Sequence, residues 1–150
     1  LMVPETMVAP LLLTDEGRIQ HAGMTVQPLG LGDLPACVHS LKGLDPQQLK
    51  ALSPDGLPYD VELLSGAALM FERKRFLELG GFDPVFGRGD FEDLDFSLRW
   101  RQAGGRLQLV PSARLTHLER QSITHQQDPL TQWRGVLNAW QAKALCPELT

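Results

Sequence analysis

The pattern of apolar and polar positions predicts several short strands. Residues 8–13 form an apolar run and residues 19–26 alternate in part, and the turn at 15–17 predicts that two strands are joined by a tight connection. Residues 106–110 are typical of a strand ended by a proline, and residues 114–118 predict another short strand.

The middle of the chain predicts a broken strand followed by a short helix. The apolar run 61–71 is interrupted at Ser65 and Gly66, so we expect a buried strand with a break at that dipeptide. A short helix is expected over 72–79, and Gly80 can end it in a left-handed conformation.

Apolar residues at helical spacing predict a longer helix next. Asp90 is the expected N-cap, Phe91, Leu94 and Leu98 form the inward stripe, and Gly104 closes the helix.

The last predicted element is an amphipathic helix. Its apolar residues recur at steps of three and four: Leu130, Trp133, Leu137, Trp140 and Ala144. Helical spacing favours core packing for the two tryptophans. Together with the strands, these helices indicate an α/β fold.

Composition and charge narrow the functional classes. The chain has 150 residues, 43% of them hydrophobic and 21% charged, which fits a globular domain or a piece of a larger one. No apolar stretch is long enough to cross a bilayer, and the net charge of −4 argues against general attraction to nucleic acid or anionic lipid. Cys37 and Cys146 lack the spacing of a zinc site and are expected to be small buried residues in a reducing compartment.

Candidate chemistry lies at the start of the helix that follows Asp90. Glu92 and Asp93 fall in its first turn, where free backbone N–H groups and the helix dipole favour carboxylates staying ionised. An ionised carboxylate there is suited to act as a general base. The alternative is that these three acidic residues only cap the helix.

Asp95 extends the acidic pattern but is predicted to be structural. It stands four residues before Arg99, the favourable order for an ion pair within a helix. Asp93 and Asp95 also match the Asp-x-Asp pattern of a metal site. Residues two apart on a helix point about 200° apart around the axis, so these two carboxylates cannot close on one ion.

Four groups of residues, in this order and at this spacing, resemble the second half of the catalytic domain of family 2 glycosyltransferases, which are inverting enzymes with the GT-A fold. They are Ser65-Gly66-Ala67, Gly80-Gly81-Phe82-Asp83, Glu92 to Phe96 with Arg99, and Val110-Pro111 leading to His117. The resemblance covers residues 8–145. It implies a partial GT-A fold with a mixed sheet and flanking helices, from which the N-terminal nucleotide-binding half is absent.

The resemblance implies roles for residues on the acceptor side. Asp93 would be the general base that takes a proton from the acceptor hydroxyl, and Glu92 would contact the acceptor or orient the loop. Ser65, Gly66 and Ala67 offer small side chains where a sugar or acceptor can approach the backbone, although a glycine in a strand also marks an ordinary bulge.

Other residues are assigned to the sugar or to the metal and diphosphate. Trp100 is placed among the sugar-binding candidates, with core packing as the alternative. The resemblance implies that His117, Arg120 and Ser122 bind a metal or the diphosphate. The alternative for His117 is an ordinary structural histidine. The remaining histidines are predicted to be structural: His21, His39 and His125.

On this reading residues 1–150 form a single, incomplete domain with four parts. The parts are strands over 8–27, a Pro/Gly-rich connection over 28–60, the acceptor and catalytic region over 61–122, and a C-terminal helix over 128–146. Within the connection, Asp45 is expected to cap a short helix that runs from Pro46 to about residue 52.

The implied activity is transfer of a sugar from a nucleotide-diphospho-sugar to a glycan or lipid-linked acceptor, in polysaccharide or cell-wall synthesis at the cytoplasmic side. The whole enzyme would use Mg²⁺ or Mn²⁺, and none is expected on this stretch alone. The first residue is not Met, which suggests a fragment. Because the resemblance implies that the nucleotide-binding half is absent, this fragment is expected to be inactive by itself and to need the upstream half of the same chain. The alternative is a non-catalytic module that binds a partner or forms a homodimer. A third hypothesis, a metal-dependent hydrolase built on the acidic helix start, would need a second cluster of metal ligands, and the sequence shows none.

Overall fold

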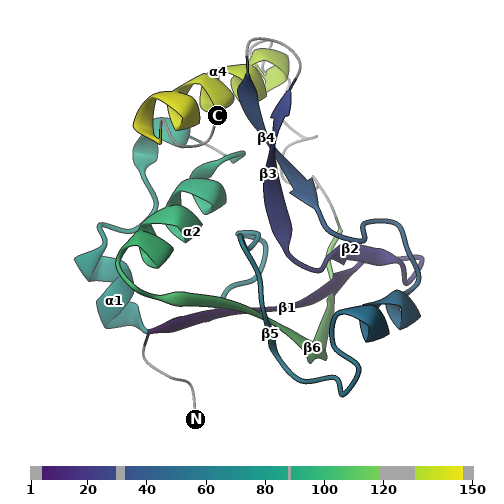
Figure 1. The fold of residues 1–150 in the computed structure, drawn as a ribbon. Coiled ribbons are helices and arrows are strands. Elements are labelled where there is room, and N and C mark those ends of the chain that lie inside the picture. The colour runs from purple at the N-terminus through teal and green to yellow at the C-terminus, as the bar shows by residue number, and fades with distance from the viewer. Residues whose placement is uncertain (1–4, 30–32, 88, 119–130, 147–150) are drawn as a thin grey trace.

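The core is built around one central strand and a helix that crosses it. Residues 5–29, 33–87, 89–118 and 131–146 are described by the computed structural model (Figure 1). The elements are, in chain order, β1 (Thr6–Leu13), β2 (Ile19–His21), β3 (Met24–Leu29), β4 (Leu34–His39), the 3₁₀ helix η1 (Pro46–Ala51), β5 (Tyr59–Asp60), α1 (Arg73–Glu78), the 3₁₀ turn η2 (Pro84–Phe86), α2 (Glu92–Gln102), β6 (Arg106–Thr116) and α4 (Thr131–Leu145).

β1 is an inner strand of a mixed four-stranded sheet. The order is β2-β1-β6-β5, with β6 parallel to β1 and β2 antiparallel to it. A parallel pair needs a long crossover, which the helices and loops between β1 and β6 provide. The prediction of an α/β fold with a mixed sheet and flanking helices is therefore confirmed.

β6 is one strand where the sequence predicts two. Pro10 of β1 pairs with Val110 and the next residue, Leu11, pairs with Arg114, so β6 carries an irregularity at residues 111–113. The predicted break at Pro111 is thus in the right place, but the strand continues beyond it because β1 supplies hydrogen-bond partners on both sides.

The main core lies between the sheet and α2, which crosses above β1 and β6 in Figure 1. Met7 and Ala9 of β1 and Leu107 of β6 point to this side and pack with Phe96 and Trp100 of α2. All five side chains are buried. Burial of two large aromatic side chains on one helix face contributes several kcal/mol and sets the position of α2 on the sheet.

The predicted strand over 61–71 is wrong. The segment makes two isolated bridges to different strands, Leu63 with Met24 and Met70 with Val8. A turn at Gly66 lies between them and redirects the chain, so neither end continues as a ladder.

The second strand and the connection also differ from the prediction. Gly23, with φ of 100°, splits the expected strand over 19–26 into β2 and β3. β3 pairs with β4 in a separate two-stranded sheet, and β4 lies inside the predicted connection over 28–60. Its Pro35 is tolerated because it stands opposite Pro28, and neither residue has an N–H to donate.

The shorter helices follow the prediction. Asp45 accepts a hydrogen bond from the Gln47 amide at 2.8 Å and caps η1. α1 spans Arg73–Glu78, and Gly80 has the expected left-handed φ of 81°.

α4 is helical as predicted, but it packs by a different face. Trp133 and Trp140 are 58% and 65% exposed, whereas Asn138, Ala139 and Ala142 are buried. The prediction that the two tryptophans pack in the core is therefore wrong, because the helix approaches β4 and η2 with its small side chains. Residues 128–130 of the predicted helix lie outside the described residues. No helix among the described residues is long and apolar enough to cross a membrane.

Gly23→Ala is expected to destabilise the fold by about 2 kcal/mol more than Gly17→Ala. Both glycines have positive φ, but a Cβ at Gly23 would lie 2.8 Å from Val61 Cγ1, whereas one at Gly17 meets nothing within 4 Å. Urea unfolding of the two variants measures the difference. Equal losses would show that the clash is relieved by movement of Val61.

Candidate functional site

The start of α2 lies against the turn at Ser65 and Gly66. The Gly66 amide donates a hydrogen bond to Asp93 Oδ2 at 2.9 Å, and Asp93 Oδ1 accepts one from the Leu94 amide at 2.9 Å. A Cβ on Gly66 would lie 3.4 Å from Asp93 Cβ and 3.6 Å from Glu92 Oε1. The structure thus brings Gly66 next to Glu92 and Asp93, although Gly66 and Asp93 are 27 residues apart in the chain.

α2 does not begin at Asp90 as predicted. The N-cap is Phe91, which has left-handed φ and ψ of 80° and −12° and makes no side-chain cap. Asp90 is also left-handed, with φ of 64°. Left-handed backbone costs a non-glycine residue about 1–3 kcal/mol, so two in succession mark a strained entry to the helix.

Burial, rather than the helix dipole, is the main influence on the pKa values of Glu92 and Asp93. The pKa of Glu92 is raised by burial and then by the negative charge of Asp93. The pKa of Asp93 is raised by burial, against the lowering effect of its backbone hydrogen bonds. The expectation that the helix start favours the ionised forms is therefore wrong in direction. Glu92 Oε2 is buried and has no hydrogen-bond partner among the described residues.

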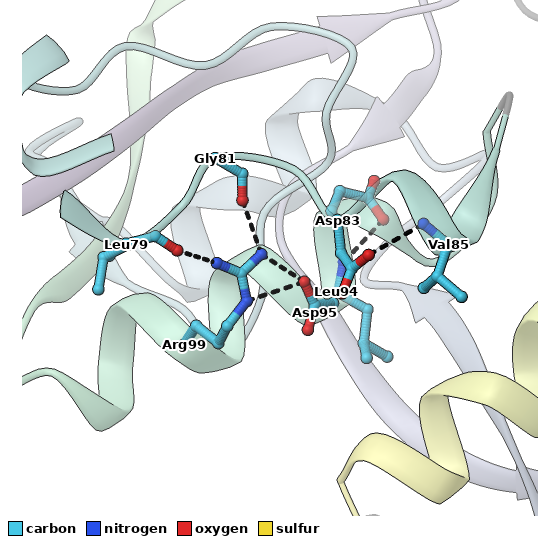
Figure 2. A network of polar contacts seen from close by, with 8 residues as sticks. Leu79, Gly81, Asp83, Val85, Leu94, Asp95 and Arg99 are labelled. Carbon is cyan, nitrogen blue, oxygen red and sulfur yellow. Dashed lines mark hydrogen bonds and ion pairs between the residues drawn. The ribbon is translucent and has the colours of Figure 1, made fainter. Parts of the chain in front are cut away.

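Asp95 faces a different part of the molecule from Asp93. In Figure 2 the Arg99 guanidinium lies between Asp95 and the carbonyl groups of Leu79 and Gly81. Arg99 Nε donates to Asp95 Oδ2 at 2.9 Å, and its Nη atoms donate to Leu79 O at 2.6 Å and Gly81 O at 2.8 Å. The predicted ion pair is confirmed, and so is the prediction that the Asp93 and Asp95 carboxylates do not converge.

Two histidines support the Ser65 turn from the other side. The Ser65 amide donates to His21 Nε2 at 3.4 Å, and His21 Nδ1 lies 3.2 Å from His39 Nδ1. Because His21 Nε2 accepts, its proton is on Nδ1, and His39 Nδ1 is the acceptor. Burial and the proximity of His39 lower the pKa of His21 to about 3. Both histidines hold neighbouring segments of the fold, and the structural role expected for them stays a prediction.

Cys37 of β4 also faces the acidic residues. Burial raises the pKa of its thiol to about 12, with further contributions from Asp93, Asp90 and Glu92. The thiol is half-buried, so the prediction of a buried cysteine is met only in part at this position, whereas Cys146 is buried. The sequence contains no signal that brings Cys37 to this place.

Trp100 is part of the core rather than a sugar-binding residue. Its side chain is fully buried among the residues between α2 and the sheet, and Nε1 donates to Glu5 O at 3.1 Å. The ring has no exposed face on which a sugar can stack, so that assignment is wrong.

Of the residues expected near a metal or diphosphate, only His117 lies in the described part. It is half-buried just after β6, and its Nδ1 lies 3.1 Å from Gln20 Oε1. The amide oxygen can only accept, so in the neutral imidazole the His117 proton is on Nδ1 and the lone pair is on Nε2. Arg120 and Ser122 lie outside the described residues. The described residues contain no group of three side chains able to hold a metal ion.

Asn138 is a site-supporting residue that sequence reasoning did not identify. From α4 its side-chain amide donates to the carbonyl groups of Phe86, Gly89 and Asp90, at 2.9, 2.9 and 2.8 Å. The sequence contains no signal for this role, because Asn138 lies outside the predicted apolar stripe and its burial, which makes the amide need partners, appears only in the structure.

The chain is similar to known glycosyltransferases over part of its length. It is 32% identical over 77 residues to human N-acetylgalactosaminyltransferase 7, a match that covers 51% of this chain and 12% of that protein. It is 29% identical over 80 residues to human polypeptide N-acetylgalactosaminyltransferase 10, which covers 53% and 13%. No protein-family model matches the chain.

The fold matches a solved structure more completely. The crystal structure of GalNAc-T7 with UDP, GalNAc and Mn²⁺ aligns with 97% of this chain and 28% of that one, with a TM-score of 0.64 and 22% identity. This shows that the fold is that of a GT-A glycosyltransferase. The matches to the two human relatives cover about an eighth of each relative's length. Family 2, polysaccharide synthesis and cell-wall synthesis stay predictions of the sequence resemblance.

Glu92→Gln is expected to raise stability at pH 7 by up to about 1 kcal/mol, after allowance for screening by water. The pKa of Glu92 is raised in the folded protein, so the wild type loses stability as pH rises through that pKa and the glutamine variant does not. The gain should vanish below about pH 4, where glutamate is protonated in both states. Urea unfolding at several pH values measures it, with the exposed Glu16→Gln as control. A gain that persists at low pH would contradict the assignment to charge.

Proposed function

We propose that the chain is part of a glycosyltransferase that moves a sugar from a nucleotide-diphospho-sugar to an acceptor hydroxyl, and that it supplies the acceptor side of the site. The observation that carries this proposal is the contact between Asp93 and the Gly66 amide, which places two carboxyl groups beside a turn of small, exposed residues. The GT-A fold and the similarity to N-acetylgalactosaminyltransferases support it. The relatives' names, and the UDP and GalNAc bound in the GalNAc-T7 structure, favour a UDP-linked N-acetylhexosamine as donor.

Asp93 is the proposed general base for an inverting transfer. The acceptor hydroxyl must lose a proton as its oxygen attacks the anomeric carbon, and a base with a raised pKa holds that proton more firmly. Burial raises the pKa of Asp93, and the exposed Gly66 and Ala67 leave room for an acceptor next to it. Glu92, whose Oε2 has no partner within the part that the structure describes, is proposed to accept a hydrogen bond from the acceptor.

His117 is the residue of the described part that fits a divalent metal. Its hydrogen bond with Gln20 leaves Nε2 as the nitrogen with a lone pair, the form in which imidazole binds metals. One imidazole supplies one ligand, so we propose that the other ligands and the nucleotide-binding groups belong to another part of the protein. When bound, such a metal neutralises charge on the diphosphate leaving group. Arg120 and Ser122, which lie outside the described residues, stay candidates for diphosphate binding from the sequence resemblance.

Transfer from UDP-N-acetylgalactosamine by the full-length protein, in the presence of Mn²⁺, tests the proposed function. Peptide, glycan and lipid-linked acceptors are compared, because the relatives' names favour the first and the family 2 resemblance favours the other two. Labelled product with any of them supports the proposal. No transfer from this donor or from other nucleotide-diphospho-sugars would overturn it. The 150-residue chain alone is expected to be inactive, and turnover by it would refute the acceptor-side assignment.

Asp93→Asn in the full-length protein is expected to lower kcat by about a hundredfold or more, as removal of a general base does, while leaving the midpoint of unfolding close to that of the wild type. Asparagine keeps one oxygen, which can accept from the Gly66 amide. Its NH2 group replaces the oxygen that accepts from the Leu94 amide, but that amide lies in the first turn of α2, so the fold should survive. Asp55→Asn, at an exposed turn, is the matched control. Retained turnover in Asp93→Asn would remove its assignment as base.

His117→Gln is expected to increase the Mn²⁺ concentration required for half-maximal activity by about tenfold or more, since loss of one protein ligand weakens a metal site. A titration of Mn²⁺ against activity measures this shift. An unchanged titration together with normal activity would show that His117 is only structural.

The second candidate is a non-catalytic module that associates with a second copy of itself. The apolar face of α4 favours it: Trp133, Val136, Leu137, Trp140 and Leu145 are each about half exposed or more. Sedimentation of the chain over a range of concentrations tests this candidate. A concentration-dependent dimer that Trp140→Glu abolishes would support it, and a monomer at every concentration would exclude it.

A further inference from the structure

We propose that Asn138 is a positioning residue for Glu92 and Asp93. The proposal rests on the proposed function only in giving these two carboxyl groups a catalytic role. Asn138 lies on α4, more than forty residues along the chain from the acids, and it contacts neither of them directly. It acts on the backbone from which α2 begins.

The side-chain amide of Asn138 donates hydrogen bonds to three carbonyl groups within one short segment. Its Nδ2 donates to Phe86 O and Gly89 O at 2.9 Å and to Asp90 O at 2.8 Å. The residue is only 3% exposed, so water does not compete effectively for these bonds. A primary amide has two N–H donors, so one of them is shared between two carbonyl oxygens.

The backbone that receives these hydrogen bonds is strained. Asp90 and Phe91 both have positive φ, and such conformations in non-glycine residues persist only when the surroundings enforce them. α4 provides that enforcement from one side. A Cβ on its Gly135 would lie 3.8 Å from Asp90 Oδ2, which shows how closely the helix approaches the turn.

The direction of the two acids depends on this turn. Glu92 follows Phe91 directly, and Asp93 is the next residue, so a change in φ or ψ at Asp90 or Phe91 rotates the first turn of α2. The contact between the Gly66 amide and Asp93 Oδ2 requires the present orientation. Asn138 therefore controls, through Asp90 and Phe91, whether Asp93 reaches Gly66.

Asparagine is suited to this place by size and charge. Aspartate has the same shape but would bring a negative charge against three carbonyl oxygens, and alanine would leave those oxygens buried without a donor. Serine is smaller and keeps one donor. Asparagine, serine and alanine at position 138 therefore carry two, one and no side-chain donors, and Asn138→Asp combines the loss of both donors with a negative charge.

The Gly66 amide is the reporter for the experiment. Hydrogen exchange of this amide, followed by NMR in the protein, measures how often its bond to Asp93 opens. We expect exchange to become about tenfold faster or more in Asn138→Ala, and faster still in Asn138→Asp, as loss of buried hydrogen bonds predicts. The Val8 amide, which donates to Met70 O in the sheet, should keep its wild-type rate.

Two further variants separate positioning from general loss of stability. Gln141→Ala removes a half-buried amide from the same helix. The Oε1 of Gln141 has no hydrogen-bond partner in the described part of the chain, so this variant should leave Gly66 exchange unchanged. Asp90→Gly removes the cost of one left-handed residue, so in the Asn138→Ala background it should restore part of the Gly66 protection. Rescue of this kind is not expected if Asn138 only supports the core.

Unchanged Gly66 exchange in a folded Asn138→Ala protein would overturn the proposal. So would collapse of the fold in both Asn138→Ala and Asn138→Ser while Gln141→Ala remains folded, because Asn138 would then support the whole fold. If glycosyl transfer is absent from the wild type but Gly66 exchange responds as expected, the proposed function fails and the positioning role stands. If the wild type is active, kcat should fall with Gly66 protection across the series, while the KM for the donor is unchanged.

Discussion

The burial of α2 on β1 and β6 is the constraint on which the rest of the structure depends. Trp100 fills the space between helix and sheet so completely that a Cβ on Gly105 would lie 2.3 Å from its Nε1. Its indole also donates to Glu5 O, at the beginning of β1. These contacts fix the position of α2, and its N-terminal turn therefore lies opposite Gly66. The candidate site is thus a consequence of core packing at the other end of the same helix.

The residues of the candidate site lower the free energy of unfolding. Asp90 and Phe91 hold costly left-handed backbone, and Glu92 has a buried oxygen without a hydrogen-bond partner among the described residues. Two other buried side-chain atoms in the described part also lack a partner, Arg75 Nε and Gln141 Oε1. The Arg99 guanidinium, by contrast, meets one carboxylate and two carbonyl groups. Left-handed non-glycine residues also occur at Asp33 and Leu41, but among the described residues only Asp90 and Phe91 stand in succession, directly before two acidic residues. Strained backbone next to ionisable groups is typical of functional sites.

Local patterns predicted much of the fold and of the candidate site. β1, η1, α1 and α2 were expected from short-range signals: apolar runs, the Asp45-Pro46 cap and helical spacing. The pair of acidic residues was also visible, because their position near a helix start can be read from sequence. The run 61–71 was misjudged since apolar composition alone does not distinguish a strand from a turn that bridges two strands. Trp133 and Trp140 were misplaced because periodicity identifies an apolar face without identifying its partner.

The sequence by itself determined the α/β class, the ion pair of Asp95 with Arg99 and the presence of carboxyl groups in the first turn of a helix. All of these depend on residues close together in the chain, whose geometry helix and strand periodicity dictate. Only the tertiary structure decided that Trp100 is core and that burial raises the pKa of Asp93. It also decided that Asn138 reaches Asp90. Burial and long-range hydrogen bonds depend on which segments meet in space, and local patterns do not contain that information.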